Sequence, residues 1–132
     1  MTVSIPVSVG ELVDKITILQ IKKSMITDEK KLEYINEECD RLCKILDEYK
    51  SEHDIQIPTL LIEKLYSINL SMWHIEDNVR IKERDQDFGP EFIELARSVY
   101  FTNDQRFDVK SEISKCGNSD ILEQKSYEDY HA

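Results

Sequence analysis

The sequence predicts an all-α protein built as a bundle of long helices, and two observations lead to this prediction. Apolar residues recur at alternating steps of three and four over long stretches of the chain, which is the period of an amphipathic helix. The 132 residues include only three glycines and three prolines, so little of the chain is left for turns, and 33% of the residues are charged. We expect residues 1–132 to form a single domain, because a chain of this length builds one hydrophobic core.

The first part of the chain predicts a long antiparallel hairpin of two helices, residues 8–54. Ser8 and Glu11 have the spacing of a capping box, in which two side chains satisfy free backbone amides at the start of a helix. This helix is expected to cover residues 9–25, and the turn at residues 26–28 to supply the cap of the second helix. The apolar residues of the second helix have a heptad-like spacing: Leu32, Ile35, Cys39, Leu42, Leu46 and Tyr49. Such spacing is typical of one helix packed along another.

Residues 59–84 predict a third helix at the centre of the bundle. One apolar stripe runs along it: Leu61, Leu65, Ile68, Met72, Ile75 and Val79. A second stripe, about 100° around the helix, begins apolar and ends polar: Ile62, Tyr66, Asn69, Trp73, Glu76, Arg80 and Glu83. To bury both stripes, neighbouring helices must pack against more than half of the circumference of this helix, whereas a surface helix normally has one apolar stripe. We therefore expect Asn69, Glu76 and Arg80 to be partly buried among polar partners. The expected partner of Glu76 is Arg97, on an inward-facing stripe of the next helix.

Residues 90–116 predict a shorter C-terminal pair of helices. Proline at position 90 follows a glycine, and this combination begins a helix after a turn. We expect a cap at Thr102 or Asn103 to separate the two helices. The last residues, 118–132, are polar but carry two tyrosines, so they predict an ordered arm or a short helix more than a free tail.

The formal net charge of −10 at pH 7 argues against two classes of partner, nucleic acids and membranes. An acidic protein is repelled by phosphate backbones and by anionic lipid headgroups. No uncharged run approaches the roughly 20 residues that cross a bilayer, and the first residues, MTVSIPVSVGEL, lack the basic region of a signal peptide. Three cysteines without a disulfide framework fit a reducing compartment, so we expect a cytoplasmic protein.

The spacing of the reactive residues predicts no catalytic residues, no metal site and no cofactor. Cys39 and Cys43 share a helical face, but zinc needs about four ligands and no further cysteine or histidine pair accompanies them. Two pairs of acids have the spacing of magnesium carboxylates: Glu37 with Asp40 and Glu91 with Glu94. A chain with 27 acidic residues also produces such pairs by chance.

Several cations could converge around the third helix and bind a small anion: Lys15, Lys22, Arg80, Arg97, Arg106 and Lys110. Arginine binds carboxylates and phosphates by bidentate contacts, so such a pocket would select a small phosphorylated or carboxylated ligand. The same cations could instead form internal ion pairs with nearby acids: Glu11, Asp14, Glu76, Asp77 and Asp104. Both interpretations stay open at this point.

Five stretches together resemble a known family: IPVSVGELVDKITIL (5–19), WHIED (73–77), ARSVY (96–100), NDQR (103–106) and KSY (125–127). The family comprises small uncharacterised proteins of bacteria and marine phages and is described as a domain of unknown function. The resemblance spans nearly the whole chain. Because the family has no established activity, the resemblance implies no catalytic role. It implies that the polar residues of these stretches form one cluster: Glu11, Asp14, Lys15, Trp73, Glu76, Arg97, Tyr100, Asn103, Asp104 and Arg106.

The candidate ligand-binding cluster consists of residues selected by periodicity or by the resemblance: Glu11, Asp14, Lys15, Asn69, Trp73, Glu76, Arg80, Arg97, Tyr100, Asp104 and Arg106. One hypothesis is a non-catalytic helical interaction or adaptor module, which predicts a cluster with every charge paired and no cavity. The alternative is a protein that binds, or an enzyme that acts on, a small anionic metabolite, which predicts a pocket with an unpaired cation. The apolar seam of the first hairpin would leave more exposed apolar surface than is usual in a monomer, so we expect a homodimer.

Overall fold

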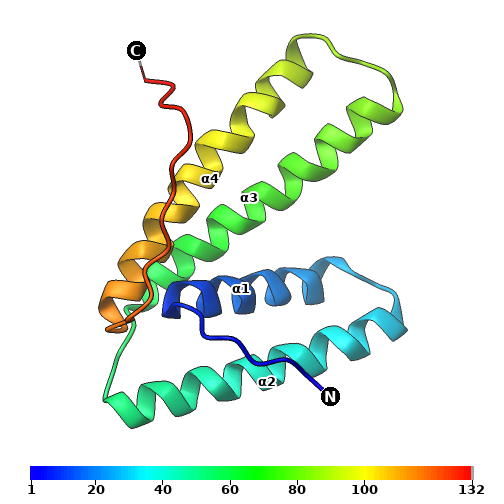
Figure 1. Ribbon diagram of the computed structural model, residues 1–132. Coiled ribbons are helices and arrows are strands. Elements are labelled where there is room, and N and C mark those ends of the chain that lie inside the picture. The colour runs from blue at the N-terminus through cyan, green and yellow to red at the C-terminus, as the bar shows by residue number, and fades with distance from the viewer. Residues whose placement is uncertain (132) are drawn as a thin grey trace.

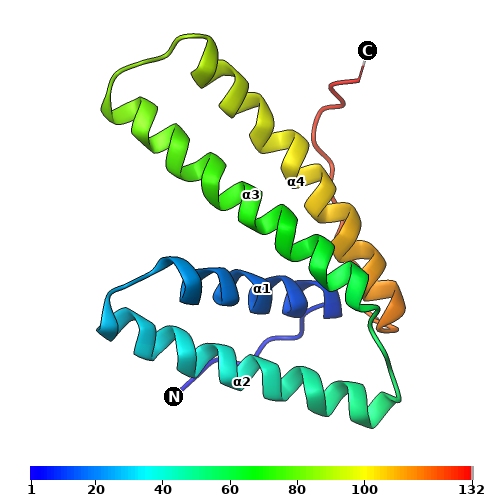
Figure 2. The same ribbon diagram turned by 180° about the vertical axis from the view of Figure 1, so that it is seen from behind.

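The computed structural model describes residues 1–131, and within them it consists of helices and irregular segments without a strand. Four α-helices follow one another along the chain: α1 (Val9–Met25), α2 (Glu29–His53), α3 (Thr59–Arg84) and α4 (Pro90–Cys116). They form two antiparallel hairpins, α1–α2 and α3–α4, which meet at one end and diverge toward the other, as Figures 1 and 2 show. The prediction of an all-α helical bundle that begins with a long hairpin is confirmed.

Side-chain caps fix the starts of the first two helices. The Ser8 hydroxyl accepts a hydrogen bond from the backbone N–H of Glu11 at 3.1 Å, as the predicted capping box requires. Asp28 accepts from the backbone N–H of Lys31 at 3.0 Å and begins α2. The second half of the capping box does not form, because the Glu11 carboxylate lies 2.7 Å from Nζ of Lys110 on α4. The glutamate thus ties α1 to another helix.

The most deeply buried helix is α1, and not α3 as the sequence predicted. Nine of the 17 residues of α1 are buried, against three of the 26 residues of α3. Helix α1 contacts each of the other helices, whereas α2 contacts only α1 among the described helices. The second half of α3 extends past α1 beside α4 (Figures 1 and 2), so its apolar side chains there are half-buried: Met72, Trp73, Ile75 and Val79. The width of the apolar arc predicts how much of a helix could be buried. The packing of the two hairpins decides how much of it is buried.

The C-terminal region contains a single helix of 27 residues, α4, so the predicted pair of shorter helices is wrong. Thr102 and Asn103 are good capping residues, but both lie inside α4. No glycine or proline interrupts the chain between Pro90 and Gly117, and an unbroken hydrogen-bonded helix outweighs the local capping preference of two residues. The expected ends are confirmed, because Pro90 occupies the first turn and Gly117 is the C-cap.

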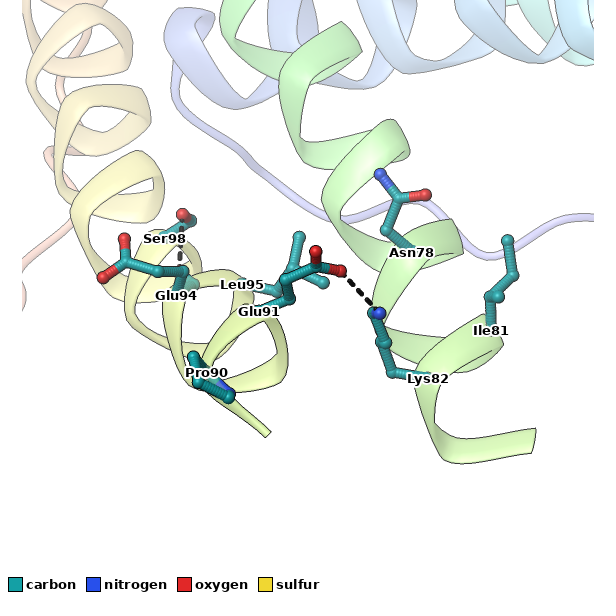
Figure 3. A pocket seen from close by; sticks show the side chains of 8 residues that line it. All are labelled: Asn78, Ile81, Lys82, Pro90, Glu91, Glu94, Leu95 and Ser98. Atoms are coloured by element: carbon teal, nitrogen blue, oxygen red, sulfur yellow. Dashed lines mark hydrogen bonds and ion pairs between the residues drawn. The ribbon is translucent and has the colours of Figure 1, made fainter. Parts of the chain in front are cut away.

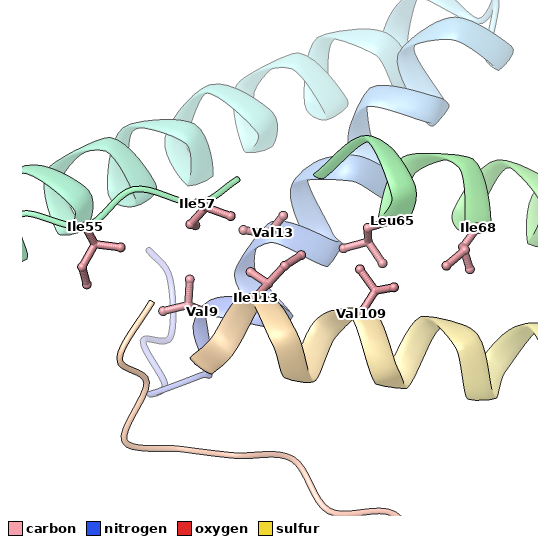
Figure 4. Packing of buried hydrophobic residues seen from close by; sticks show 8 residues of the cluster. All are labelled: Val9, Val13, Ile55, Ile57, Leu65, Ile68, Val109 and Ile113. Carbon is pink, nitrogen blue, oxygen red and sulfur yellow. The ribbon is translucent and has the colours of Figure 1, made fainter. Parts of the chain in front are cut away.

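The hydrophobic core lies where the two hairpins meet. Its buried residues come from α1, α3, α4 and the α2–α3 connection (Figure 4): Val9, Val13, Ile55, Ile57, Leu65, Ile68, Val109 and Ile113. Helix α2 buries one residue, Cys39, because it packs on α1 alone. The hydroxyl of Tyr49 donates to the backbone carbonyl of Gly117 at 2.8 Å and so joins the end of α2 to the end of α4.

Both ends of the chain are extended segments outside the helices. Residues 1–7 are exposed and carry no regular secondary structure. The arm predicted at 118–132 is described up to residue 131, and residue 132 lies outside the described residues. This C-terminal arm has no helix and runs back along α4 (Figure 1). Its side chains make polar contacts with one face of α4.

Candidate functional site

A buried carboxylate, that of Asp14 on α1, lies at the centre of the polar cluster. Its residue is 0% exposed. Arg106 on α4 donates two hydrogen bonds to it, from Nε to Oδ1 at 3.0 Å and from Nη2 to Oδ2 at 2.5 Å. Asn69 on α3 donates from Nδ2 to Asp14 Oδ1 and to the hydroxyl of Thr17, both at 2.9 Å. A carboxylate removed from water needs such partners to remain charged. The hydrogen bonds that Arg106 donates to Asp14 raise the pKa of Arg106, so its guanidinium stays protonated.

Lys110 on α4 is the second buried charge, and it faces three carboxylates. Its Nζ lies 2.7 Å from Glu11, 2.9 Å from Glu123 of the C-terminal arm and 4.0 Å from Asp14. Burial acts to lower the pKa of Lys110, but the hydrogen bonds to Glu11 and Glu123 outweigh it and hold that pKa above its ordinary value. Lys110 is therefore a fixed positive charge that joins α1, α4 and the arm.

The close approach of α1 and α4 at Gly10 makes this cluster possible. The backbone N–H of Gly10 donates to the Ser114 hydroxyl at 2.9 Å. A Cβ atom at Gly10 would lie 2.1 Å from the backbone carbonyl oxygen of Lys110, which is shorter than any tolerable contact. Only glycine allows the two backbones to lie this close together. Side chains as short as aspartate can then reach from α1 to α4.

A second polar site lies outside this cluster, between α4 and the C-terminal arm. The carboxylate of Asp104 accepts hydrogen bonds from Nζ of Lys125 and from the hydroxyl of Tyr130, both at 2.5 Å. The Lys125 contact and then the Tyr130 contact lower the pKa of Asp104. The hydrogen bond between Tyr130 and Asp104 also raises the pKa of Tyr130 to about 12. The ring of Tyr130 packs 5.0 Å from that of Tyr100 and 5.1 Å from that of Phe101, measured between centroids.

Two cavities adjoin these residues. One has a volume of about 420 Å³ and lies between α4 and the arm, where Arg106, Lys110 and Glu123 line it. The other has a volume of about 940 Å³ and lies further along the same groove, against Asp104 and Tyr130. Among residues 1–131, every buried side-chain nitrogen and oxygen has a hydrogen-bond partner, and no group of three or more metal-binding side chains comes together.

Comparison with known families matches residues 1–131 to one described as a family of unknown function. The chain belongs to DUF6165. Comparison with curated proteins and with solved structures gave no match. The function of this DUF6165 chain must therefore be inferred from its own side chains.

The structure brings together part of the candidate cluster of this DUF6165 chain. Glu11, Asp14, Asn69 and Arg106 meet at the α1–α3–α4 junction, as described above. Lys15 lies at the edge, half exposed, with Nζ 3.8 Å from Glu11. Tyr100 and Asp104 belong to the second polar site beneath the arm. These candidates thus separate into two groups, one at the α1–α3–α4 junction and one beneath the arm.

The remaining candidates lie on the diverging part of the α3–α4 hairpin. Glu76 pairs with Arg80 at 2.7 Å on the surface of α3, and Arg97 pairs with Glu94 at 3.5 Å on α4. The predicted Glu76–Arg97 pair is therefore wrong, as is the expected burial of Arg80. With no third helix over this region, long side chains pair with neighbours on their own helix in water. Trp73 is half-buried there.

Two partners of the buried cluster were not expected: Thr17, which is buried, and Glu123, an exposed residue of the arm that pairs with Lys110. Thr17 lies three residues after Asp14 and on the same helical face, so its position next to a buried carboxylate could have been found from the spacing. Glu123 belongs to the arm, where no periodicity relates it to α4. Lys110 was considered only as one cation of a possible anion pocket.

Proposed function

We propose that the protein is a non-catalytic helical interaction module that forms a homodimer through its α3–α4 hairpin. The observation that carries this proposal is the exposed apolar surface of the hairpin where it extends past α1. Ile81 and Ile93 are 42% and 54% exposed, and Phe88 in the connecting turn is 49% exposed. Two antiparallel helices cannot bury all of their apolar surface against each other, and a second pair completes a four-helix arrangement.

The space between the two helices supports the same proposal. A groove of about 550 Å³ separates α3 from α4 near the turn, with Ile81 and Leu95 among its lining residues (Figure 3). The ion pair between Lys82 and Glu91, at 2.6 Å, spans it. A twofold-related copy would bring the same apolar side chains to this groove, as an isologous interface requires.

The buried cluster supports a structural role and not a catalytic one. Arg106 is paired with Asp14, and Lys110 with Glu11 and Glu123. General acid–base catalysis needs a titratable group that can exchange a proton with a substrate near the working pH. The carboxylates here are held by cations that remain charged, so the cluster fastens α1, α3, α4 and the arm to one another.

The alternative, binding of a small anionic metabolite, has one supporting feature, the 420 Å³ cavity beside Arg106. The charges near it weaken this alternative. Three cations, Arg106, Lys110 and Lys125, are already paired with four carboxylates: Glu11, Asp14, Asp104 and Glu123. An anion would have to displace a carboxylate from a cation that it already neutralises. Thermal unfolding with phosphate or citrate tests this directly, and a rise in Tm would favour the alternative.

Gel filtration with light scattering at micromolar concentration tests the homodimer. We expect a mass of about twice the 15.6 kDa of the chain. The variant Ile93→Asp should convert the dimer to a monomer, because it places a charge in the apolar interface. Ile45→Asp on α2 is the matched control, since Ile45 is 51% exposed and Ile93 54%. A monomeric wild-type protein contradicts the homodimer, and dissociation by Ile45→Asp alone would place the interface on α2.

The proposal includes a cytoplasmic location. All three cysteines are free, and Sγ of Cys39 and Sγ of Cys43 lie 4.0 Å apart without a bond, which fits a reducing compartment. No described helix has a stretch long and apolar enough to cross a membrane. The net charge of −10 supports a partner other than nucleic acid or an anionic membrane. Occurrence in bacteria and marine phages stays a prediction. Protein isolated without a reductant should titrate as three thiols per chain, and a disulfide would contradict this location.

A further inference from the structure

We infer that the larger cavity, of about 940 Å³ beside Asp104 and Tyr130, is a recognition site for an alkylammonium group, and that Lys125 of the same chain occupies it. The site lies outside the buried α1–α4 cluster and does not depend on the proposed homodimer. Its ligand class is a primary amine, either a free amine or the side chain of a lysine in a partner protein.

The surroundings of the Lys125 ammonium carry this inference. Its Nζ lies 2.5 Å from the carboxylate of Asp104. It also lies over two aromatic rings, 5.7 Å from the centroid of Phe107 and 5.5 Å from that of Tyr127. A cation within about 6 Å of an aromatic face is attracted by the ring quadrupole, and proteins bind organic ammonium ligands in this way. One carboxylate and two rings around a single ammonium form a complete recognition site of this kind.

The cavity is larger than one lysine side chain requires. A volume of about 940 Å³ remains open beside Lys125, within the range of small-ligand sites. The aromatic rings of Tyr100 and Tyr130 form further walls. A second ammonium group or a longer alkyl chain has room there.

The charges that face this cavity favour a cation. Asp104, Glu128 and Asp129 contribute three carboxylates, against Lys125 and the imidazole of His131. The imidazole of His131 is hydrogen-bonded to the Asp129 carboxylate at 3.0 Å, so the three carboxylates face at most two basic groups, one of which is already paired. Negative charge is therefore in excess, and an anion is disfavoured at this site.

The fixed and the displaceable parts of the site lie on different segments. Asp104 and Phe107 belong to α4, a regular helix of 27 residues. Lys125 and Tyr127 belong to the arm, which has no regular secondary structure. An external ammonium can thus replace that of Lys125 at Asp104 while α4 is unchanged. Because Lys125 competes from within the same chain, it lowers the apparent affinity for any external amine.

The test is titration calorimetry on the full chain with two probes, 1,5-diaminopentane as a free amine and Nα-acetyl-lysine amide as a lysine side chain. Lys125→Met removes the internal ammonium and keeps an unbranched side chain, so we expect at least about tenfold tighter binding of one probe than in the wild type. Asp104→Asn in the Lys125→Met background should abolish binding. Whichever probe binds tighter identifies the source of the amine.

Lys115→Met is the matched control, because Lys115 is an exposed lysine near the end of α4 and away from this cavity. It should bind the probes as the wild type does. Phe107→Leu in the Lys125→Met background should weaken binding about fivefold or more, since it removes one ring face. Three results would overturn the inference: Lys125→Met binds neither probe at millimolar concentration, Asp104→Asn leaves binding unchanged, or Lys115→Met gives the same gain as Lys125→Met.

Discussion

At Asp14 a carboxylate has been removed from water and surrounded by the side chains of three helices. Arg106 from α4 and Asn69 from α3 both donate to it, and Thr17 shares the amide of Asn69. Buried ion pairs contribute little net free energy relative to apolar residues of the same volume, but they are costly to break. Because its pairs are costly to break, this cluster determines how the helices pack against one another.

Asp14→Asn should destabilise the fold by about 2–4 kcal/mol, because Arg106 and Lys110 then lose a buried partner. We place the value in the lower part of the range for buried pairs, since the Arg106 side chain is 28% exposed and keeps contact with water. Urea unfolding measures the change. Glu94→Gln breaks the exposed pair with Arg97 and should cost less than about 0.5 kcal/mol. If Asp14→Asn and Glu94→Gln lower the free energy of unfolding equally, Asp14 is not the centre of a buried ion-pair cluster.

Gly10→Ala should destabilise the protein by about 1–3 kcal/mol, because the new methyl group collides with the backbone carbonyl of Lys110 at 2.1 Å. Helix propensity alone predicts the opposite sign, a gain of up to about 1 kcal/mol for alanine over glycine. The midpoint of thermal unfolding distinguishes the two. Gly89→Ala is the control, since a methyl group there meets only the flexible Asp87 carboxylate at 3.2 Å. A more stable Gly10→Ala protein would disprove the close approach.

Among the elements of the fold, the C-terminal arm depends most on ionisation. It is attached to α4 through Glu123, Lys125 and Tyr130, each of which contributes a hydrogen bond or an ion pair. Its aliphatic residues Ile121 and Leu122 are 44% and 47% exposed, and its main apolar contact is the ring of Tyr130. The attachment should therefore respond to pH more than the helical core does.

The arm should be fully attached between about pH 4 and pH 10 and should loosen on either side. The pKa of Asp104 is lowered by its partners, so its contribution is present above the unfolded value and is lost as the pH falls through the folded one. The pKa of Tyr130 is raised to about 12, so its contribution is present below the ordinary phenol value of about 10 and is lost as the pH rises toward about 12.

Absorbance at 295 nm measures the ionisation of tyrosines at alkaline pH. One of the six tyrosines, Tyr130, should ionise near pH 12. Tyr130→Phe should remove that late step. Tyr34→Phe, at an exposed tyrosine on α2, is the control and should leave the late step in place. If Tyr130→Phe leaves the late step in place, the hydrogen bond to Asp104 does not exist in solution.

For the whole molecule, the divergence of the two hairpins is the feature with the largest consequences. The core lies where they meet, so the far part of α3–α4 has only its own two helices for packing (Figures 1 and 4). This geometry leaves Ile81, Phe88 and Ile93 exposed. A homodimer through this region would bury them and would link stability to protein concentration.

The Tm of the wild-type protein should rise with protein concentration, because dissociation accompanies the unfolding of a homodimer. Scanning calorimetry from micromolar to hundreds of micromolar measures this. Ile93→Asp should have a Tm that does not change over the same range, while Ile45→Asp should behave as the wild type. A concentration-independent Tm in the wild type would speak against the homodimer.

The sequence by itself determined the helical class, the first hairpin, the Ser8 cap and the final Gly117 stop, because these follow from local spacing and from backbone amides that only nearby residues can satisfy. It also predicted that Asn69 is partly buried among polar partners, and the family resemblance placed Asp14 and Arg106 in one polar cluster. Only the tertiary structure decided that α1, and not α3, is the central helix. It also decided that Glu76 and Arg97 never meet and that Glu123 completes the cluster. The central place of α1 depends on the angle between the hairpins, to which the close contact at Gly10 and the core packing between distant residues contribute. The other two outcomes depend on how α3 faces α4 and on the path of the arm. Periodicity along one helix carries no information about that angle.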